Sequence, residues 1–218
     1  MKIHKVLMAA VCSCIVLAGC GSAYVEEQDS LKESAVRKME DGEYDKALEQ
    51  INEALALAGT RVTKREIDLS YYKAAAQYAM GDYDFAMETC DNLIKYNKKD
   101  AKAYFLRACT YIGNEDPQSA VEDFKTAASL MGEEQDEVLL RGFISLMSAG
   151  YTEDARAYFD ETKDLMTDQA RILYEQIAVM ETDGNYSGAL RVAEEYLKLK
   201  PEDEAVSREY EFLKSVAE

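Results

Sequence analysis

The sequence predicts an all-α protein in which pairs of helices follow one another along the chain. Only two prolines interrupt its 218 residues, and Ala, Leu, Glu and Lys come in blocks of helical length. A short glycine-tyrosine-alanine pattern also recurs, while alternating runs typical of strands are few. We therefore expect helices throughout, joined by turns at the recurring pattern.

The chain begins with a segment typical of protein export. Lys2 and Lys5 precede an uncharged, largely apolar run from Val6 to Gly19. This run is shorter than the roughly 20 residues that a membrane-spanning helix needs. A basic start, an apolar middle and a small-residue end are typical of a removable export signal. We therefore expect residues 1–19 to be a signal peptide.

The end of that run, Leu17-Ala18-Gly19-Cys20, resembles the lipobox of bacterial lipoproteins. The resemblance implies cleavage before Cys20 and a diacylglyceryl group on its sulfur, the alternative being a plain uncleaved anchor. Two acyl chains hold a protein firmly on a bilayer, whereas one chain binds only marginally. We expect residues 20–29 to be a lipidated tether and the protein to sit on the extracytoplasmic face of the cell membrane or the outer membrane.

Five copies of a repeat follow the tether. Clear copies of Gly-x-Tyr-x-x-Ala begin at Gly42, Gly81 and Gly184, and weaker copies begin at Asp116 and Gly150. Glycine can end a helix in the left-handed conformation, and alanine lets two helices cross closely. The third copy lacks the glycine and tyrosine, but Asp116-Pro117 supplies an N-cap and a first-position proline. The pattern alanines, spaced by 39, 34, 35 and 34 residues, are Ala47, Ala86, Ala120, Ala155 and Ala189.

A 34-residue period with this pattern resembles the tetratricopeptide repeat (TPR), a stacked helix-turn-helix unit. The resemblance implies a right-handed α-α superhelix, the TPR solenoid, with five helix pairs and a C-terminal capping helix. Ser30 and Glu33 have capping-box spacing, which predicts the start of the first helix. The extra residues Gly59–Arg65 predict a longer loop or extra helical turns without a domain boundary. The expected repeats cover about 30–61, 67–100, 101–134, 136–169 and 170–200, with the capping helix over 201–218.

Composition limits the partners. Without residues 1–19 the chain has 199 residues, 23 of them basic and 42 acidic, a net charge of −19. Such a surface repels nucleic-acid phosphates and anionic headgroups. We expect no nucleic-acid partner, and a neutral or basic protein partner fits better.

Catalytic, cofactor and metal sites are not expected. The single histidine, His4, lies in the predicted signal peptide, so histidine-based nucleophilic catalysis has no base. The sequence has no glycine-rich phosphate loop and no calcium loop. Cys90 and Cys109 are too few for a zinc site, and we expect both to be small buried hydrophobes, although one disulfide between them stays open. We therefore expect no enzyme, no cofactor and no small-molecule substrate.

The remaining candidate site is the inner face formed by the first helix of each pair. In the register set by the glycines, an apolar and aromatic lane crosses the middle repeats, and lanes of this length are usually covered by something. Tyrosine and methionine are typical of adaptable binding surfaces. The alternative is that the lane packs as core between neighbouring helices. The predicted groove residues are Tyr71, Tyr78, Phe105, Cys109, Ile112, Leu140, Ile144, Met147 and Tyr174.

Some TPR domains hold a peptide carboxylate through asparagines on this face, but Val36, Ala75, Cys109, Ile144 and Ala178 stand at those positions. We therefore expect hydrophobic contacts. The leading hypothesis is a membrane-anchored, non-catalytic lipoprotein that binds a protein or peptide with apolar anchors. The alternatives are a structural subunit of an envelope assembly machine, of the outer-membrane insertion or pilus type, that uses edge and convex surfaces, and a scaffold that self-associates through the lane.

Overall fold

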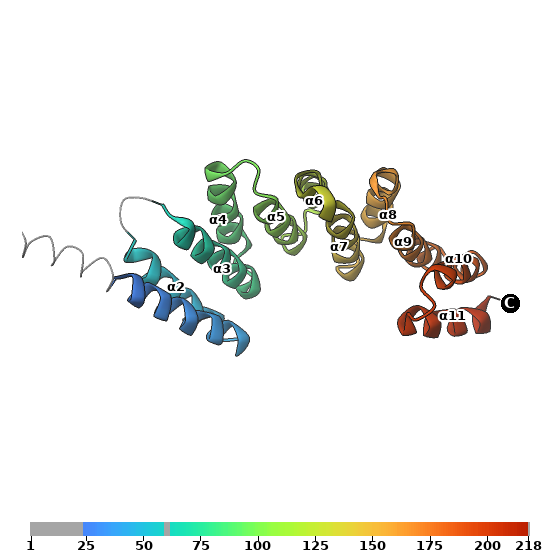
Figure 1. The fold of residues 1–218 in the computed structure, drawn as a ribbon, viewed down its shortest axis with the longest axis horizontal. Coiled ribbons are helices and arrows are strands. Elements are labelled where there is room, and N and C mark those ends of the chain that lie inside the picture. Colours follow the sequence, from blue (N-terminus) through green and yellow to red (C-terminus); the bar gives the residue numbers. More distant parts are fainter. Residues whose placement is uncertain (1–23, 59–61, 218) are drawn as a thin grey trace, which may run out of the picture. The chain divides into compact units, whose positions relative to one another are not determined.

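The computed structural model describes residues 24–58 and 62–217, which divide into two compact units between Leu93 and Ile94. Every regular element within these ranges is a helix (Figure 1). The expectation of an all-α chain is thus confirmed. The predicted signal peptide and Cys20 lie outside the described residues.

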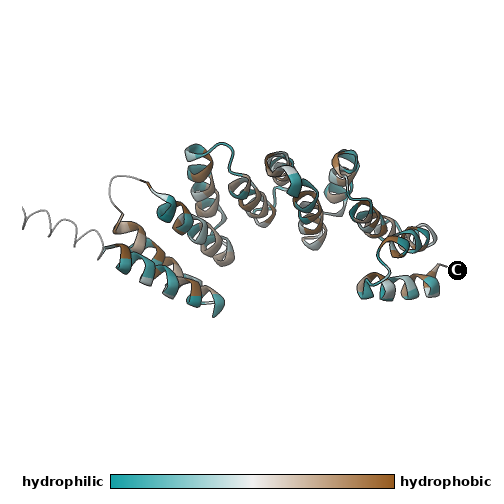
Figure 2. Cartoon of the chain, viewed as in Figure 1, coloured by the Kyte–Doolittle hydropathy of each residue, from teal (hydrophilic) through white to brown (hydrophobic). Residues whose placement is uncertain are grey.

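Unit 1 contains a helix over residues 24–40, followed by α2 (Tyr44–Ala56), α3 (Lys64–Met80) and most of α4 (Tyr83–Tyr96). Hydrophobic residues on these helices recur with helical spacing (Figure 2), so each helix can bury one face. The buried cluster of this unit consists of Ala35, Ala47, Ile51, Ala54 and Leu69.

Unit 2 continues the same alternation of longer helices and short turns. Its helices are α5 (Ala101–Gly113), α6 (Pro117–Met131), α7 (Gln135–Ser148), α8 (Thr152–Thr162), α9 (Gln169–Thr182), α10 (Tyr186–Leu199) and α11 (Glu204–Val216), with short 3-10 turns before α7 and after α8. One buried cluster joins α5 to α8 and a second joins α9 to α11. Successive helices therefore share a core with their neighbours in the chain.

The turns form as the sequence predicts. Gly42, Gly81, Gly150 and Gly184 all have positive φ angles, between 69° and 85°. In the third turn Glu115 occupies the matching position with φ 61°, while Asp116 accepts a hydrogen bond from the Ser119 N–H and Pro117 opens α6. The third turn thus adopts the left-handed conformation without glycine. The five pattern alanines are all fully buried, as their role at close helix crossings requires.

The start of the first helix differs from the prediction. Residues 24–29, expected to be part of a tether, are helical, so Ser30 lies inside a helix and does not cap one. The capping box forms instead at α3, where Glu66 accepts from the Thr63 N–H at 2.7 Å and Thr63 Oγ1 accepts from the Arg65 N–H at 3.2 Å. Ser30 and Glu33 have the spacing of a capping box. The helix nevertheless begins upstream of Ser30, where Gln28 is buried and bonds to the neighbouring helices.

The last helix, α11, packs on the other helices of unit 2 through one apolar face. Val206 and Leu213 are buried in the α9–α11 cluster, and Tyr210 packs against it. Phe212 and Val216 lie outside this face and are exposed. The solvent-facing side of the cap therefore includes apolar side chains.

Candidate functional site

The nine predicted groove residues lie on the first helix of their pairs. Tyr71 and Tyr78 are on α3 in unit 1, and the other seven are on α5, α7 and α9 in unit 2. All nine keep some solvent exposure. Tyr78, Ile144 and Tyr174 are exposed, and the rest are half-buried.

Part of this set belongs to the core of unit 2. Phe105, Cys109, Ile112 and Met147 pack against the buried α5–α8 cluster. The Phe105 ring lies 5.2 Å from the ring of buried Phe124, centroid to centroid. These four side chains therefore pack mainly as core, as the alternative prediction holds.

Three other residues meet around an open cavity. Leu140 and Ile144 from α7 and Tyr174 from α9 line a cavity of about 400 Å³. Tyr196 of α10 lies against Tyr174, with ring centroids 6.2 Å apart, and its hydroxyl donates a hydrogen bond to Asp203 at 2.8 Å. Burial and the Asp203 carboxylate raise the pKa of Tyr196 to about 12, so it stays a neutral donor. We call this cavity the α7–α9 groove.

A cluster of charged residues forms one side of the α7–α9 groove. Asp168 caps α9 by accepting from the Ala170 N–H at 2.9 Å, which fixes the direction of its first turn. Arg171, which follows Ala170, forms ion pairs with both Asp168 and Glu137. Arg141 pairs with Glu137 from the same helix at 2.8 Å, and the two arginines hold the pKa of Glu137 below its usual range. The acidic charges of this wall are therefore already neutralised by arginines.

Asp136 joins α7 to the start of α9. It accepts from the Thr167 N–H at 2.8 Å and from the Asp168 N–H at 2.7 Å. Burial opposes ionisation of Asp136, but these backbone donors outweigh it and lower its pKa. The sequence analysis missed this cluster, although a signal existed: Glu137 and Arg171 have opposite charges and stand 34 residues apart, one repeat period.

A larger, more polar cavity of about 1070 Å³ adjoins the groove. It shares Glu137, Asp168 and Arg171 with the α7–α9 groove and extends past Phe105 to the start of α5. Six carboxylates and four lysine or arginine side chains line it, so its lining has a small excess of negative charge. It offers room for polypeptide that continues beyond the apolar groove.

Two carboxyl groups of α9 have raised pKa values. Glu175 is fully buried and neither of its oxygens has a hydrogen-bond partner among the described residues; burial raises its pKa to about 8. Burial, a hydrogen bond with Glu209 and the charge of Glu209 raise the pKa of Glu181 to about 7. Glu175 does not line either cavity, so its proton is not placed to reach a ligand there. Among the described residues, no group of three or more His, Cys, Asp or Glu could hold a metal ion.

Cys90 and Cys109, the two cysteines outside the predicted signal and lipidation segments, do not form a disulfide with each other. Cys90 is fully buried, and Cys109 is half-buried, with its pKa raised to about 11 by burial. A thiol with so high a pKa is a poor nucleophile. In residues 24–58 and 62–217, none of the helices combines the length and hydropathy needed to span a bilayer.

Comparison with known proteins shows the fold. No family model matches the chain. A TPR protein from Parabacteroides merdae has a TM-score of 0.60 at 16% identity, with 88% of this chain and 73% of that chain covered. Kinesin light chain TPR-like repeats from Podosopora anserina give 0.58 at 17% identity, with 79% and 96% covered. YrrB, a TPR protein with an unusual peptide-binding site, gives 0.51 at 15% identity, with 88% and 97% covered.

Among curated proteins, human DnaJ homolog subfamily C member 7 is 25% identical over 158 residues, 72% of this chain. The matched region spans only 32% of that protein's length. The mouse protein of the same name matches at 24% identity over the same length. Together with the helix order, these likenesses show that the chain has an all-α TPR solenoid fold.

Proposed function

We propose that the protein is a lipid-anchored, extracytoplasmic TPR module that binds a protein or peptide without catalysing a reaction. The anchor rests on the lipobox at Leu17–Cys20. The binding role rests on one structural observation: the α7–α9 groove exposes Leu140, Ile144 and Tyr174 beside a wall of paired charges. Apolar and aromatic side chains that stay accessible next to a pre-ordered polar wall are typical of peptide-binding surfaces.

The groove favours a partner with an apolar or aromatic side chain. Its charged lining is balanced, because Glu137 and Asp168 are matched by Arg171 and Lys200. The net charge of −19 expected for the anchored chain favours a neutral or basic partner at longer range and disfavours nucleic acid. A side chain of the partner would fill the groove while its neighbours extend into the larger cavity.

Photo-crosslinking tests the groove with a matched control. Tyr174 and Tyr186 are 40% and 39% exposed, but only Tyr174 lines the groove. A photoreactive phenylalanine derivative is placed at either position in the anchored protein, and envelope preparations are irradiated. We expect a discrete crosslinked partner from position 174 and little from position 186. Equal crosslinking from both positions contradicts the groove assignment, and a crosslinked second copy of this chain identifies self-association instead.

Substitution gives an independent readout on the same partner. Ile144→Glu places a charge in the groove, whereas Phe212→Glu places one on the exposed face of α11. We expect the first variant to lose the crosslinked partner and the second to keep it. Cys20→Ser tests the anchor separately, since it is expected to move the protein out of the membrane fraction.

A further inference from the structure

Exposed apolar side chains gather at one end of unit 1. Tyr24 and Val25, in the first described turn of the 24–40 helix, are 52% and 39% exposed. Val62, just before α3, is 52% exposed. The 24–40 helix enters the described region where α2 ends and α3 begins, so these residues share one end of the unit (Figure 1).

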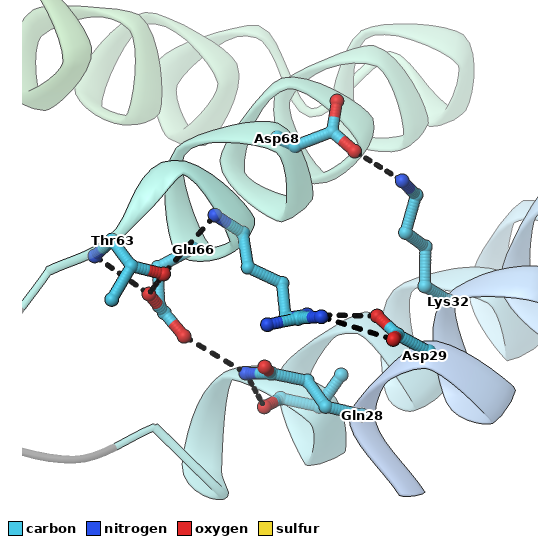
Figure 3. A network of polar contacts seen from close by, with 8 residues as sticks. Gln28, Asp29, Lys32, Thr63, Glu66 and Asp68 are labelled. Atoms are coloured by element: carbon cyan, nitrogen blue, oxygen red, sulfur yellow. Dashed lines mark hydrogen bonds and ion pairs between the residues drawn. The ribbon is translucent and has the colours of Figure 1, made fainter. Parts of the chain in front are cut away.

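A polar network holds that end together (Figure 3). Gln28 donates to the Ala54 carbonyl at 2.9 Å and to Glu66 Oε1 at 3.0 Å, which ties the N-terminal helix to α2 and α3. Arg65 donates to both oxygens of Asp29, at 2.8 and 3.0 Å. The turn that carries Tyr24 and Val25 is therefore fixed relative to the start of α3, where Val62 lies.

We propose that this end of unit 1 rests on the lipid bilayer, with Tyr24, Val25 and Val62 in the interfacial layer. The inference builds on the proposed lipidation of Cys20. Only three residues separate Cys20 from Tyr24 in the sequence, so the two Cα atoms are at most about 14 Å apart. An acylated Cys20 would thus hold Tyr24 within reach of the headgroup region, where the amphipathic ring of tyrosine is favoured.

The charged residues around Tyr24, Val25 and Val62 indicate which kind of lipid surface this end of unit 1 would contact. Glu26 and Glu27 are exposed beside the tyrosine, and Lys64 follows Val62. Among the described residues at this end, the other two cations, Lys32 and Arg65, are paired with Asp68 and Asp29. Because these described residues carry no excess of positive charge, the proposed contact is apolar and needs no anionic lipid.

The opposite end of unit 1 supplies a control position. Phe85 follows the turn at Gly81 and is 60% exposed. The α3 helix has 17 residues, so its two ends are about 25 Å apart along its axis. A membrane that lies across the Val62 end of α3, as the proposal has it, therefore does not contact Phe85.

Tryptophan reporters test the contact, because the chain has no tryptophan of its own. The acylated full chain with Val62→Trp or Phe85→Trp is reconstituted in phosphatidylcholine vesicles with or without bromine-labelled acyl chains. We expect the Val62→Trp emission to shift to shorter wavelength and lose intensity with brominated lipid, and the Phe85→Trp emission to do neither. Tyr24→Trp reads the same surface if Val62→Trp does not fold.

The outcomes separate this contact from the anchor. Equal emission and quenching for Val62→Trp and Phe85→Trp, in protein whose N-terminal peptide has the mass of an acylated Cys20, overturn the contact and leave the anchor standing. An N-terminal peptide without acyl chains overturns both. A signal that appears only when anionic lipid is added overturns the apolar contact, whereas an unchanged signal supports it.

Discussion

The two units use the same helix-pair repeat but hold their helices together differently. The buried cluster of unit 1 is small and aliphatic, and half-exposed polar contacts such as Asp29–Arg65 and Lys32–Asp68 connect its helix pairs. The main cluster of unit 2 is rich in aromatic residues, including Phe124, Phe143, Tyr158 and Phe159. Aromatic side chains can pack against many different apolar neighbours. A hydrogen bond or ion pair, by contrast, is lost when either of its two partners is removed.

The difference shows how repeat pairs can be joined. In unit 1, Asp29–Arg65 and Lys32–Asp68 each connect residues 36 positions apart, close to one repeat period. In unit 2, Glu137–Arg171 connects residues 34 positions apart, but it adds to an extensive apolar core. Both units tolerate buried polar atoms without a hydrogen-bond partner among the described residues, such as Gln50 Oε1 in unit 1 and both oxygens of Glu175 in unit 2, but only in unit 2 do such atoms belong to carboxyl groups.

The largest expected effect tests that tolerance through Glu175→Gln. Because burial raises the folded-state pKa of Glu175 from 4.5 to about 8, the folded state holds a proton that the unfolded state releases. The contribution of Glu175 to stability should be most favourable below pH 4.5 and fall as pH rises towards 8, by about 1.4 kcal/mol per pH unit at most. The variant should remove this fall and be more stable than the native chain at pH 8, as measured by denaturant unfolding.

The comparison at low pH is the control for Glu175→Gln. Below pH 4.5 both side chains are neutral and similar in shape, so the two proteins should have similar free energies of unfolding. If the fall in stability between pH 4.5 and 8 persists in the variant, Glu175 is not its source. The unpaired carboxyl of Glu175 would then not distinguish unit 2 from unit 1.

An intermediate effect is expected in unit 1 from Gln28→Ala. The change removes the donor to the Ala54 carbonyl, and Ala54 is itself fully buried. A buried acceptor left without its partner costs about 1–3 kcal/mol, which urea unfolding would detect. The matched control is Gln118→Ala in unit 2, whose amide is exposed and bonds to Asp154 at 3.1 Å. Equal losses for the two variants would mean that unit 1 has no special dependence on its polar contacts.

The smallest effect concerns the one turn of this pattern that lacks glycine. Glu115 has φ 61°, a conformation that costs a residue with a side chain about 1–2 kcal/mol. Glu115→Gly removes this cost but adds about 0.5–1 kcal/mol of backbone entropy, so we expect a gain in unfolding free energy of at most about 1.5 kcal/mol. Gly81→Ala in unit 1 is the reverse control and should destabilise, because alanine is strained at the φ of 80° that Gly81 adopts. The added methyl group meets no atom within 4 Å, so the loss would come from the backbone conformation and not from a clash. A loss of stability in Glu115→Gly would show that the glutamate side chain itself supports the turn.

Much of the fold follows from local sequence. Gly42, Gly81, Gly150 and Gly184 end helices because glycine adopts positive φ at little cost, and the alanine five positions later is buried each time. The start of the first helix could not be predicted in the same way. Ser30 and Glu33 have the local pattern of a cap, but the bonds of Gln28 to Ala54 and Glu66 come from residues distant in sequence, and they extend the helix.

The candidate site was likewise predictable from the sequence only in part. The sequence by itself determined which helices carry the apolar lane and which residues point along it, because helical periodicity fixes the face of each residue. Only the tertiary structure decided that Phe105, Cys109, Ile112 and Met147 pack against the core while Leu140, Ile144 and Tyr174 line a cavity. The physical reason is that exposure depends on which neighbours cover a side chain, and the ion pair of Arg171 with Glu137 helps to set how α9 lies against α7.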